Sequence, residues 1–288
     1  MIFSIFKKIF KFIFVEIVYN GHLQTLGALG IVMFSSSLLK VEVAWESLLI
    51  LYLSFYSFYL YNRYKEKDID YLTNQTRTKH IKKIDNYVPY IILVILLTLA
   101  TLLCYFGDFH FVIFVLIIVV FGFLYTSYFK NLTKKITIFK NIYVSSVFAM
   151  LVFFSIIYHS LPLKNFLASG IAIMIFVFLK ALIVQVFLDL KDIKCDQKEG
   201  LRTLGVLLGQ KKVLQILKIA SIVIAGFIPL FLLSLNIFPS SILMIFVLIP
   251  FNFYCFNLVE KGKISGFIIG SGEFIIWPIL ILLGNKFL

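Results

Sequence analysis

The feature that most constrains this chain is a series of long apolar runs at regular intervals. A membrane-spanning helix needs about 20 mostly apolar residues, because the hydrocarbon core is about 30 Å thick and each helical residue rises about 1.5 Å. Such runs occupy residues 23–39, 44–61, 87–106, 110–129, 141–158, 165–188, 213–235, 238–258 and 264–284. Because unpaired backbone groups are costly in lipid, these continuous runs predict helices. We expect an all-α integral membrane protein with nine transmembrane helices around a central cavity.

Composition excludes the soluble classes of protein. Hydrophobic residues make up 61% of the chain and charged residues only 14%, whereas a soluble domain has about 25% charged residues. The net charge of +13 would suggest a nucleic-acid partner in a soluble protein. In a membrane protein, the excess of Lys and Arg in cytoplasmic loops explains it better. We therefore expect a lipid bilayer, and no nucleic acid, as the partner of this chain.

The distribution of Lys and Arg predicts an orientation. If the N-terminus is cytoplasmic and the spans alternate, 22 of the 27 Lys and Arg residues fall in cytoplasmic segments and three fall outside. This bias is the one that the positive-inside rule describes. Two cytoplasmic connections, 62–86 and 189–212, are long, and a third, 130–140, is of middle length. We expect these loops to cap the cavity on the cytoplasmic side, in the cell membrane.

The chain is predicted to form one transmembrane domain. Residues 1–22 contain an apolar stretch interrupted by Lys7, Lys8 and Lys11, which favours a helix lying at the membrane interface over a spanning one. Residues 23–288 contain all of the spans and hold no polar segment long enough for a soluble domain.

Oxygen-bearing side chains are concentrated near the cytoplasmic ends of two spans. They form two groups: Asn62, Glu66 and Asp70, and Asp189, Asp192 and Asp196. The spacing of each group predicts that its members share one face of a helix. Carboxylates so close together repel, and carboxylate and amide oxygens suit Mg²⁺. We interpret both groups as metal ligands that hold a diphosphate between Mg²⁺ ions; the alternative is that these are loop charges paired with nearby Lys and Arg.

Basic residues follow or flank both groups. They include Arg77, Lys130, Lys140 and Arg202. Cations at these positions would neutralise a leaving diphosphate.

The three loops resemble those of the UbiA superfamily of intramembrane prenyltransferases. The second long loop is similar to the second aspartate motif of that family at Asp192, Asp196, Gly200, Thr203 and Gly209. The middle loop is similar to the family's Tyr-Ser…Lys segment at Tyr125, Ser127, Lys130, Lys140 and Asn141. The first loop resembles the family's N-D-x2-D-x3-D motif at Asn62, Glu66 and Asp70.

The first loop also departs from the family pattern. Arg63 stands where the family usually has Asp, and Glu66 replaces the next Asp. The usual Arg-Pro pair after the motif is replaced by Thr78, Lys79 and His80. We expect Arg63 to bind phosphate directly, since its guanidinium cannot bind a metal.

The resemblance implies a reaction: Mg²⁺-dependent transfer of a prenyl group from an allylic polyprenyl diphosphate to a small hydrophobic or aromatic acceptor, such as a quinone precursor or a lipid precursor. It implies catalytic roles for Asp70, Asp192, Asp196 and Tyr125. It implies diphosphate binding by Arg63, Arg77, Lys130, Lys140 and Arg202.

Two other functions remain open. Arg63 is compatible with a relative of this family whose catalysis is altered. Lys180 and Glu273 lie within predicted spans, and charged residues at such depth are typical of transport pathways, so a membrane transporter is the second alternative.

Overall fold

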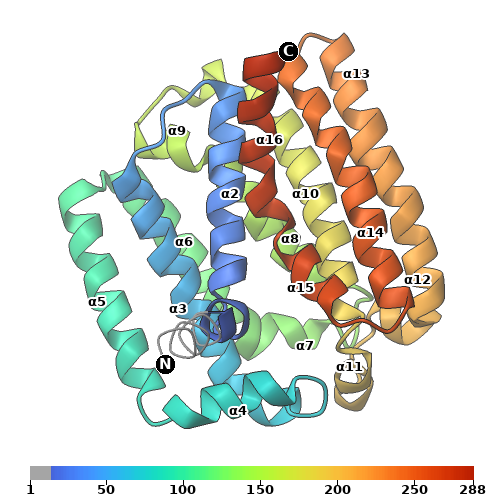
Figure 1. The fold of residues 1–288 in the computed structure, drawn as a ribbon. Helices are drawn as coiled ribbons and strands as arrows, with labels where there is room; N and C mark the ends of the chain where they lie inside the picture. The colour runs from blue at the N-terminus through green and yellow to red at the C-terminus, as the bar shows by residue number, and fades with distance from the viewer. Residues whose placement is uncertain (1–13) are drawn as a thin grey trace, which may run out of the picture.

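The computed structural model describes residues 14–288, and all of the regular structure in that range is helical. Figure 1 shows a bundle of long, roughly parallel and antiparallel helices. The predicted all-α class is therefore confirmed. Most of the expected interfacial segment, 1–22, lies outside the described residues; the part that is described includes a helical stretch, 14–19.

The long helices of the described chain are of two kinds. The first kind keeps one helix type throughout: α2 (His22–Leu39), α3 (Trp45–Asp70), α5 (Val88–Phe106) and α10 (Leu167–Asp189). The second kind is made of elements that follow one another directly or after one residue, in some cases with a bend. These are α6 (Phe109–Leu124), η1 (Tyr125–Phe129) and α7 (Lys130–Leu132); α8 (Phe139–Met150), η2 (Leu151–Phe153) and α9 (Phe154–Tyr158); α12 (Leu204–Ile222), η4 (Val223–Phe227) and α13 (Ile228–Ser234); η5 (Ser240–Val247) and α14 (Leu248–Glu260); α15 (Ser265–Ser271) and α16 (Glu273–Phe287). Short elements complete the fold: α4 (Gln75–Ile84), η3 (Leu163–Asn165) and α11 (Ile193–Glu199).

The structure contains fewer helices that are long and apolar enough to cross a membrane than the nine that the sequence predicts. Within residues 14–288, seven helices are long and apolar enough to cross a membrane, or eight if the bent pair α15–α16 counts as one span. Helix α3, which contains the expected span 44–61, is not among them, since Tyr and Ser interrupt its apolar residues and its last two turns are charged. The prediction of nine spans is therefore not confirmed.

Small residues allow the central helices to pack closely. A Cβ atom at Gly30 of α2 would clash with the carbonyl group of Phe274 in α16, and Gly284 lies equally close to the backbone of Ser241. Such contacts are common between membrane helices, where close van der Waals packing replaces the hydrophobic effect. The aromatic core lies at the same place: Trp277 is fully buried, with its ring centroid 4.8 Å from that of Phe34.

A buried network of polar and charged side chains links α10, α14 and α16. Lys180 of α10 forms an ion pair with Glu273, with 2.8 Å between Nζ and Oε1. Asn252 of α14 accepts from the same Nζ at 3.3 Å and donates to Glu273 at 2.8 Å. Glu273 begins α16, directly after the 50° bend that separates it from α15. The network therefore links three helices at the bend, and it satisfies the two charges that the sequence placed inside spans.

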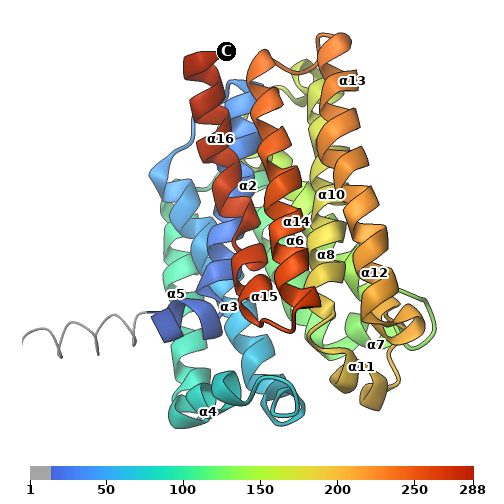
Figure 2. The same ribbon diagram turned by 45° about the vertical axis from the view of Figure 1, so that its right-hand side comes forward.

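The polar connections gather at one end of this scaffold. Figures 1 and 2 place α4, α7 and α11 at the same end of the bundle, where α3 and α10 terminate. The two acidic groups flank the same region, because Asp70 ends α3 and Asp189 ends α10.

Candidate active site

The first acidic group lies on one face of α3, as the spacing predicts. Glu66 accepts from Nζ of Lys130 at 2.6 Å. Asn62 accepts through Oδ1 from the hydroxyl of Thr126 at 2.9 Å. Asp70 forms a buried ion pair with Arg77 of α4. The helical face is confirmed, and each of its three members already has a protein partner.

The second acidic group does not share a helical face, so that part of the prediction was wrong. Asp189 is the last residue of α10, Asp192 has non-helical backbone angles, and Asp196 belongs to α11. The chain turns between the two helices, and the carboxylate of Asp192 lies at this turn. Its Oδ1 accepts from Thr73 and Asn74, each at 2.9 Å. Both contacts come from the segment that follows α3.

Lys140 forms ion pairs with the other two carboxylates of the second group. Its Nζ, which is buried, lies 3.1 Å from Oδ1 of Asp189 and 2.8 Å from Oδ2 of Asp196. Asn141 donates to the remaining oxygen of Asp189 at 2.7 Å. Burial raises the pKa of Asp196 to about 6, although the Lys140 ammonium opposes this shift. The site thus holds two carboxylates around one cation.

The two groups are brought together, as the sequence predicts, but partly by residues that it did not single out. Thr73 and Asn74, just after the first group, bind Asp192 of the second. Lys130 bridges Glu66 on α3 and Glu199 on α11, with 2.6 and 2.8 Å to their carboxylates. The only sequence signal for Thr73 and Asn74 is that they are polar and lie three and four positions after Asp70.

A large basic cavity opens beside the acidic groups. It has a volume of about 630 Å³ and lies between the end of α3, the start of α4, the turn after α10, and α15. The positively charged residues that line it are Arg63, Arg77, Lys191, Lys194 and Lys263. Arg63 is nine-tenths buried, and within residues 14–288 its Nε has no hydrogen-bond partner. Burial and the neighbouring guanidinium groups lower the pKa of Lys191 to about 8.

A second, smaller pocket lies on the other side of α3. It measures about 60 Å³ and is almost entirely aromatic and apolar, with Phe55, Phe58, Tyr125 and Phe148 among its lining residues. Asn62 closes its polar end. Since Asn62 and Arg63 are adjacent on a helix, their side chains diverge by about 100°. One turn of α3 therefore separates an apolar pocket from a basic cavity.

Two predicted residues have contacts that differ from those expected. Arg202 is exposed, and it joins the site through its backbone, which exchanges hydrogen bonds with Thr133 and Ile138. Among the described residues its guanidinium has no ion-pair partner. Tyr125 lines the apolar pocket, where its ring stacks on Tyr143 with 5.8 Å between centroids.

Comparison with known proteins decides the family. The model of the UbiA prenyltransferase family matches residues 25–270. The chain belongs to the UbiA prenyltransferase family. It is thus an integral membrane protein, and the predicted family is confirmed. No curated protein matches the sequence of this UbiA-family chain.

Solved structures share the fold of this UbiA-family protein. A UbiA homologue from Aeropyrum pernix K1, without ligand, superposes with a TM-score of 0.65 at 15% identity, over 91% of this chain and 96% of that chain. A homologue from Archaeoglobus fulgidus bound to DMAPP and Mg²⁺ gives 0.61 at 15% identity, over 93% and 99%. A digeranylgeranylglyceryl phosphate synthase gives 0.57 at 15% identity, over 94% and 95%.

The donor chemistry of the second acidic group fits the metal that this family implies. Asp189 and Asp196 already surround a cation, the Nζ of Lys140, and oxygen ligands alone suit Mg²⁺. Within residues 14–288, however, no three carboxylate, thiol or imidazole groups converge in a metal-binding arrangement. In the UbiA-family protein, metal binding at this group therefore requires Lys140 to release at least one carboxylate.

Proposed function

We propose that the protein transfers a prenyl group from an allylic polyprenyl diphosphate to a small acceptor within the membrane. The observation that carries this proposal is the meeting of the two acidic groups at the end of α3, where Lys130 joins Glu66 to Glu199 and Lys140 joins Asp189 to Asp196. The basic cavity beyond Arg63 suits a diphosphate, and the aromatic pocket beyond Asn62, of about 60 Å³, suits only the short allylic end of an isoprenoid. A homologue of the same fold was solved with geranyl diphosphate and Mg²⁺, which supports the same class of donor here.

The proposed roles follow the positions of the side chains. Mg²⁺ would be held by Asp189, Asp192 and Asp196, with Asn62, Glu66 and Asp70 as the second and weaker ligand group, and it would stabilise negative charge on the leaving diphosphate. The cations proposed to hold the diphosphate are Arg63, Arg77, Lys130, Lys140 and Arg202. The allylic C–O bond breaks with its electron pair going to the diphosphate. The nucleophilic atom of the acceptor bonds to that carbon and loses its proton to water.

Aromatic rings line the place where the allylic carbon would lie. Tyr125 and Tyr143 line the small pocket, with their rings stacked on each other, and aromatic rings stabilise cationic character by about 0.5–2 kcal/mol. We therefore assign Tyr125 to the stabilisation of the developing carbocation.

Turnover by the purified protein tests this function. The protein in lipid nanodiscs is incubated with Mg²⁺, radiolabelled prenyl diphosphates and a panel of aromatic and lipid-precursor acceptors. We expect a prenylated product and free diphosphate, both abolished by EDTA. Binding of the donor without turnover for any acceptor would instead indicate a relative with altered catalysis.

Removal of the Arg63 guanidinium is expected to weaken binding of the donor. Arg63→Ala should lower the affinity for geranyl diphosphate by about tenfold, since a charge-assisted hydrogen bond in a buried site is lost. Arg63→Asp, which restores the family residue, should weaken binding further and raise the Mg²⁺ requirement. Affinity is measured across Mg²⁺ concentrations, with Lys65→Ala, an exposed position on the same helix, as the matched control. Unchanged affinity of Arg63→Ala at every concentration would remove Arg63 from the site.

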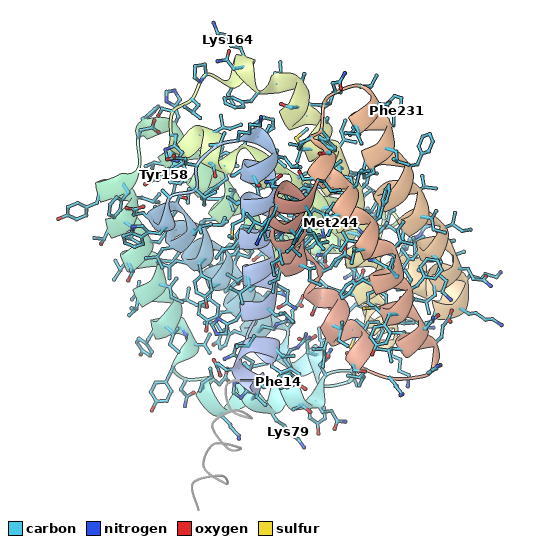
Figure 3. All side chains as sticks on the ribbon, turned by 45° about the horizontal axis from the view of Figure 1, so that its top comes forward. Phe14, Lys79, Tyr158, Lys164, Phe231 and Met244 are labelled. Atoms are coloured by element: carbon cyan, nitrogen blue, oxygen red, sulfur yellow. The ribbon has the colours of Figure 1, made fainter. Side chains whose placement is uncertain are left out.

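The orientation of the protein is a separate prediction. In a Cys104→Ser background, cysteines placed at Lys79 and Gln197 should react with an impermeant thiol reagent only from the cytoplasmic side. A cysteine at Lys164, which lies at the opposite end of the molecule from Lys79 in Figure 3, should react only from outside. All three native side chains are exposed, so access through the membrane decides the result. Labelling of Lys79→Cys from outside would overturn the orientation.

A further inference from the structure

The connection between α7 and α8 contains a threonine that contacts the main chain of three proposed diphosphate-binding residues. Thr133 is fully buried. Its backbone N–H donates to the carbonyl of Lys130 at 3.1 Å, and its own carbonyl accepts from the backbone N–H of Arg202 at 3.0 Å. Its hydroxyl oxygen accepts from the backbone N–H of Lys140, also at 3.0 Å. One buried residue therefore links the main chain at Lys130, Lys140 and Arg202.

The hydroxyl of Thr133 supplies a hydrogen bond that α8 cannot supply itself. The first N–H groups of a helix have no carbonyl partner within it, and Lys140 is the second residue of α8. The residue before the helix, Ile138, is apolar, so its side chain cannot cap these groups. Thr133 provides the partner for the N–H of Lys140 from outside the helix, in a buried place. The start of α8 therefore depends on one hydroxyl oxygen.

The backbone just before Lys140 is strained. Ile138 has a φ of 56°, and a left-handed conformation is an outlier for a β-branched residue. A hydrogen bond from its N–H to the carbonyl of Arg202, at 3.0 Å, holds it in place. Strained residues of this kind persist where the surrounding contacts fix them, and they cluster at functional sites. The strain therefore indicates that the exact position of the chain before Lys140 matters for function.

The ammonium group of Lys140 needs such a fixed position. It is buried between two carboxylates, 3.1 Å from Oδ1 of Asp189 and 2.8 Å from Oδ2 of Asp196. Asp196 belongs to α11, and Arg202 lies on the segment that follows this helix. The Thr133–Arg202 hydrogen bond and the Lys140–Asp196 ion pair thus join the same two parts of the chain. A shift at the start of α8 would move the ammonium group away from both carboxylates.

We propose that Thr133 is a positioning residue of the candidate active site, whose hydroxyl fixes the start of α8 and thereby places the ammonium group of Lys140. Thr133 lines neither the basic cavity nor the aromatic pocket, so it acts through Lys140 and not on the donor. The inference rests on the proposed function, because that function assigns Lys140 to the diphosphate.

Removal of the hydroxyl tests the inference. Thr133→Val keeps the branched shape of the side chain but leaves the buried N–H of Lys140 without a partner. We expect the affinity for geranyl diphosphate with Mg²⁺, measured in nanodiscs without acceptor, to fall by about tenfold. Thr133→Ser keeps the oxygen and should bind the donor like the wild type. Unchanged affinity in Thr133→Val would overturn the inference, and so would an equal loss in Thr133→Ser.

Thr137→Val is the matched control. It makes the same chemical change in the same connection, at a half-buried side chain, while the N–H of Lys140 keeps its bond to Thr133. We expect it to bind geranyl diphosphate like the wild type, and thermal unfolding in detergent shows that each variant is folded. Equal losses in Thr133→Val and Thr137→Val would assign the effect to the connection as a whole and overturn the role of the hydroxyl.

A double-mutant cycle shows whether Thr133 acts through Lys140. In Lys140→Gln the ammonium group is absent, so adding Thr133→Val should cause no further loss of donor affinity. Additive losses would mean that Thr133 supports the fold in general, which overturns the inference. The comparison of Thr133→Val with Thr133→Ser decides the question even if Lys140→Gln does not fold.

The same cycle separates this inference from the proposed function. A loss of donor affinity in Lys140→Gln without a loss in Thr133→Val contradicts only the positioning role of Thr133. Wild-type affinity in a folded Lys140→Gln variant contradicts the assignment of Lys140 to the diphosphate, and the inference with it.

Discussion

Replacing Asp196 by alanine is expected to lower the rate of prenyl transfer by at least about 100-fold. Asp196 is buried and shares the Nζ of Lys140 with Asp189. Without it, the second acidic group keeps one carboxylate at this cation and loses the oxygen ligands that a divalent metal needs. Asp192→Ala should have a similar effect and should also release Thr73 and Asn74, to which that carboxylate is bound. Turnover is measured across Mg²⁺ concentrations in nanodiscs.

The matched control is Asp68→Ala, since Asp68 is exposed and, among residues 14–288, forms its ion pair with Lys82 on the surface. It should retain nearly full activity. Thermal unfolding in detergent separates lost chemistry from lost structure, and all three variants are expected to unfold cooperatively. Mg²⁺-dependent activity of Asp196→Ala close to that of the wild type would show that Asp196 is not a metal ligand.

Removing the buried ammonium of Lys180 is expected to destabilise the protein by about 3–5 kcal/mol. Lys180→Met keeps the volume of the side chain but leaves Glu273 as an uncompensated buried charge next to Asn252. Because Glu273 begins α16, the bend between α15 and α16 should loosen first. The free energy of unfolding is measured in mixed detergent micelles.

The double variant Lys180→Met/Glu273→Gln shows whether the pair is the cause. It removes both charges and keeps a polar partner for Asn252, so it should recover most of the lost stability. If the double variant were as unstable as Lys180→Met, packing around Lys180 and not the ion pair would explain the loss.

The ion pair also bears on what the sequence can and cannot predict. Charges at Lys180 and Glu273 suggested a transport pathway because each was considered alone. Ninety-three positions separate them in the chain, and nothing local in the sequence pairs them. The structure makes each the partner of the other, with both side chains almost fully buried. The ion pair therefore explains why two charged residues lie inside the bundle. The two charges no longer favour a transporter.

The two acidic groups illustrate the same limit in the site. Asn62, Glu66 and Asp70 could be placed on one face because α3 continues unbroken through them. The same periodicity failed for Asp189, Asp192 and Asp196, because α10 ends at Asp189 and the chain turns before α11, where Thr73 and Asn74 bind the carboxylate of Asp192. Helical spacing is a local property, and tertiary contacts decide where a helix ends.

The π-helical turn η1 has a consequence for how this chain is compared with its relatives. A π turn accommodates one more residue than the α-helix around it, so it acts as an insertion of one position inside a rod that otherwise looks continuous. Lys130 follows η1 immediately and reaches Glu66 and Glu199 in that shifted register. In an ungapped alignment with a homologue that lacks the extra residue, Lys130 would be matched to the next side chain along the chain. An alignment of this segment should therefore place a one-residue gap within residues 125–129, and equivalent cations should be matched by their carboxylate partners and not by their sequence number.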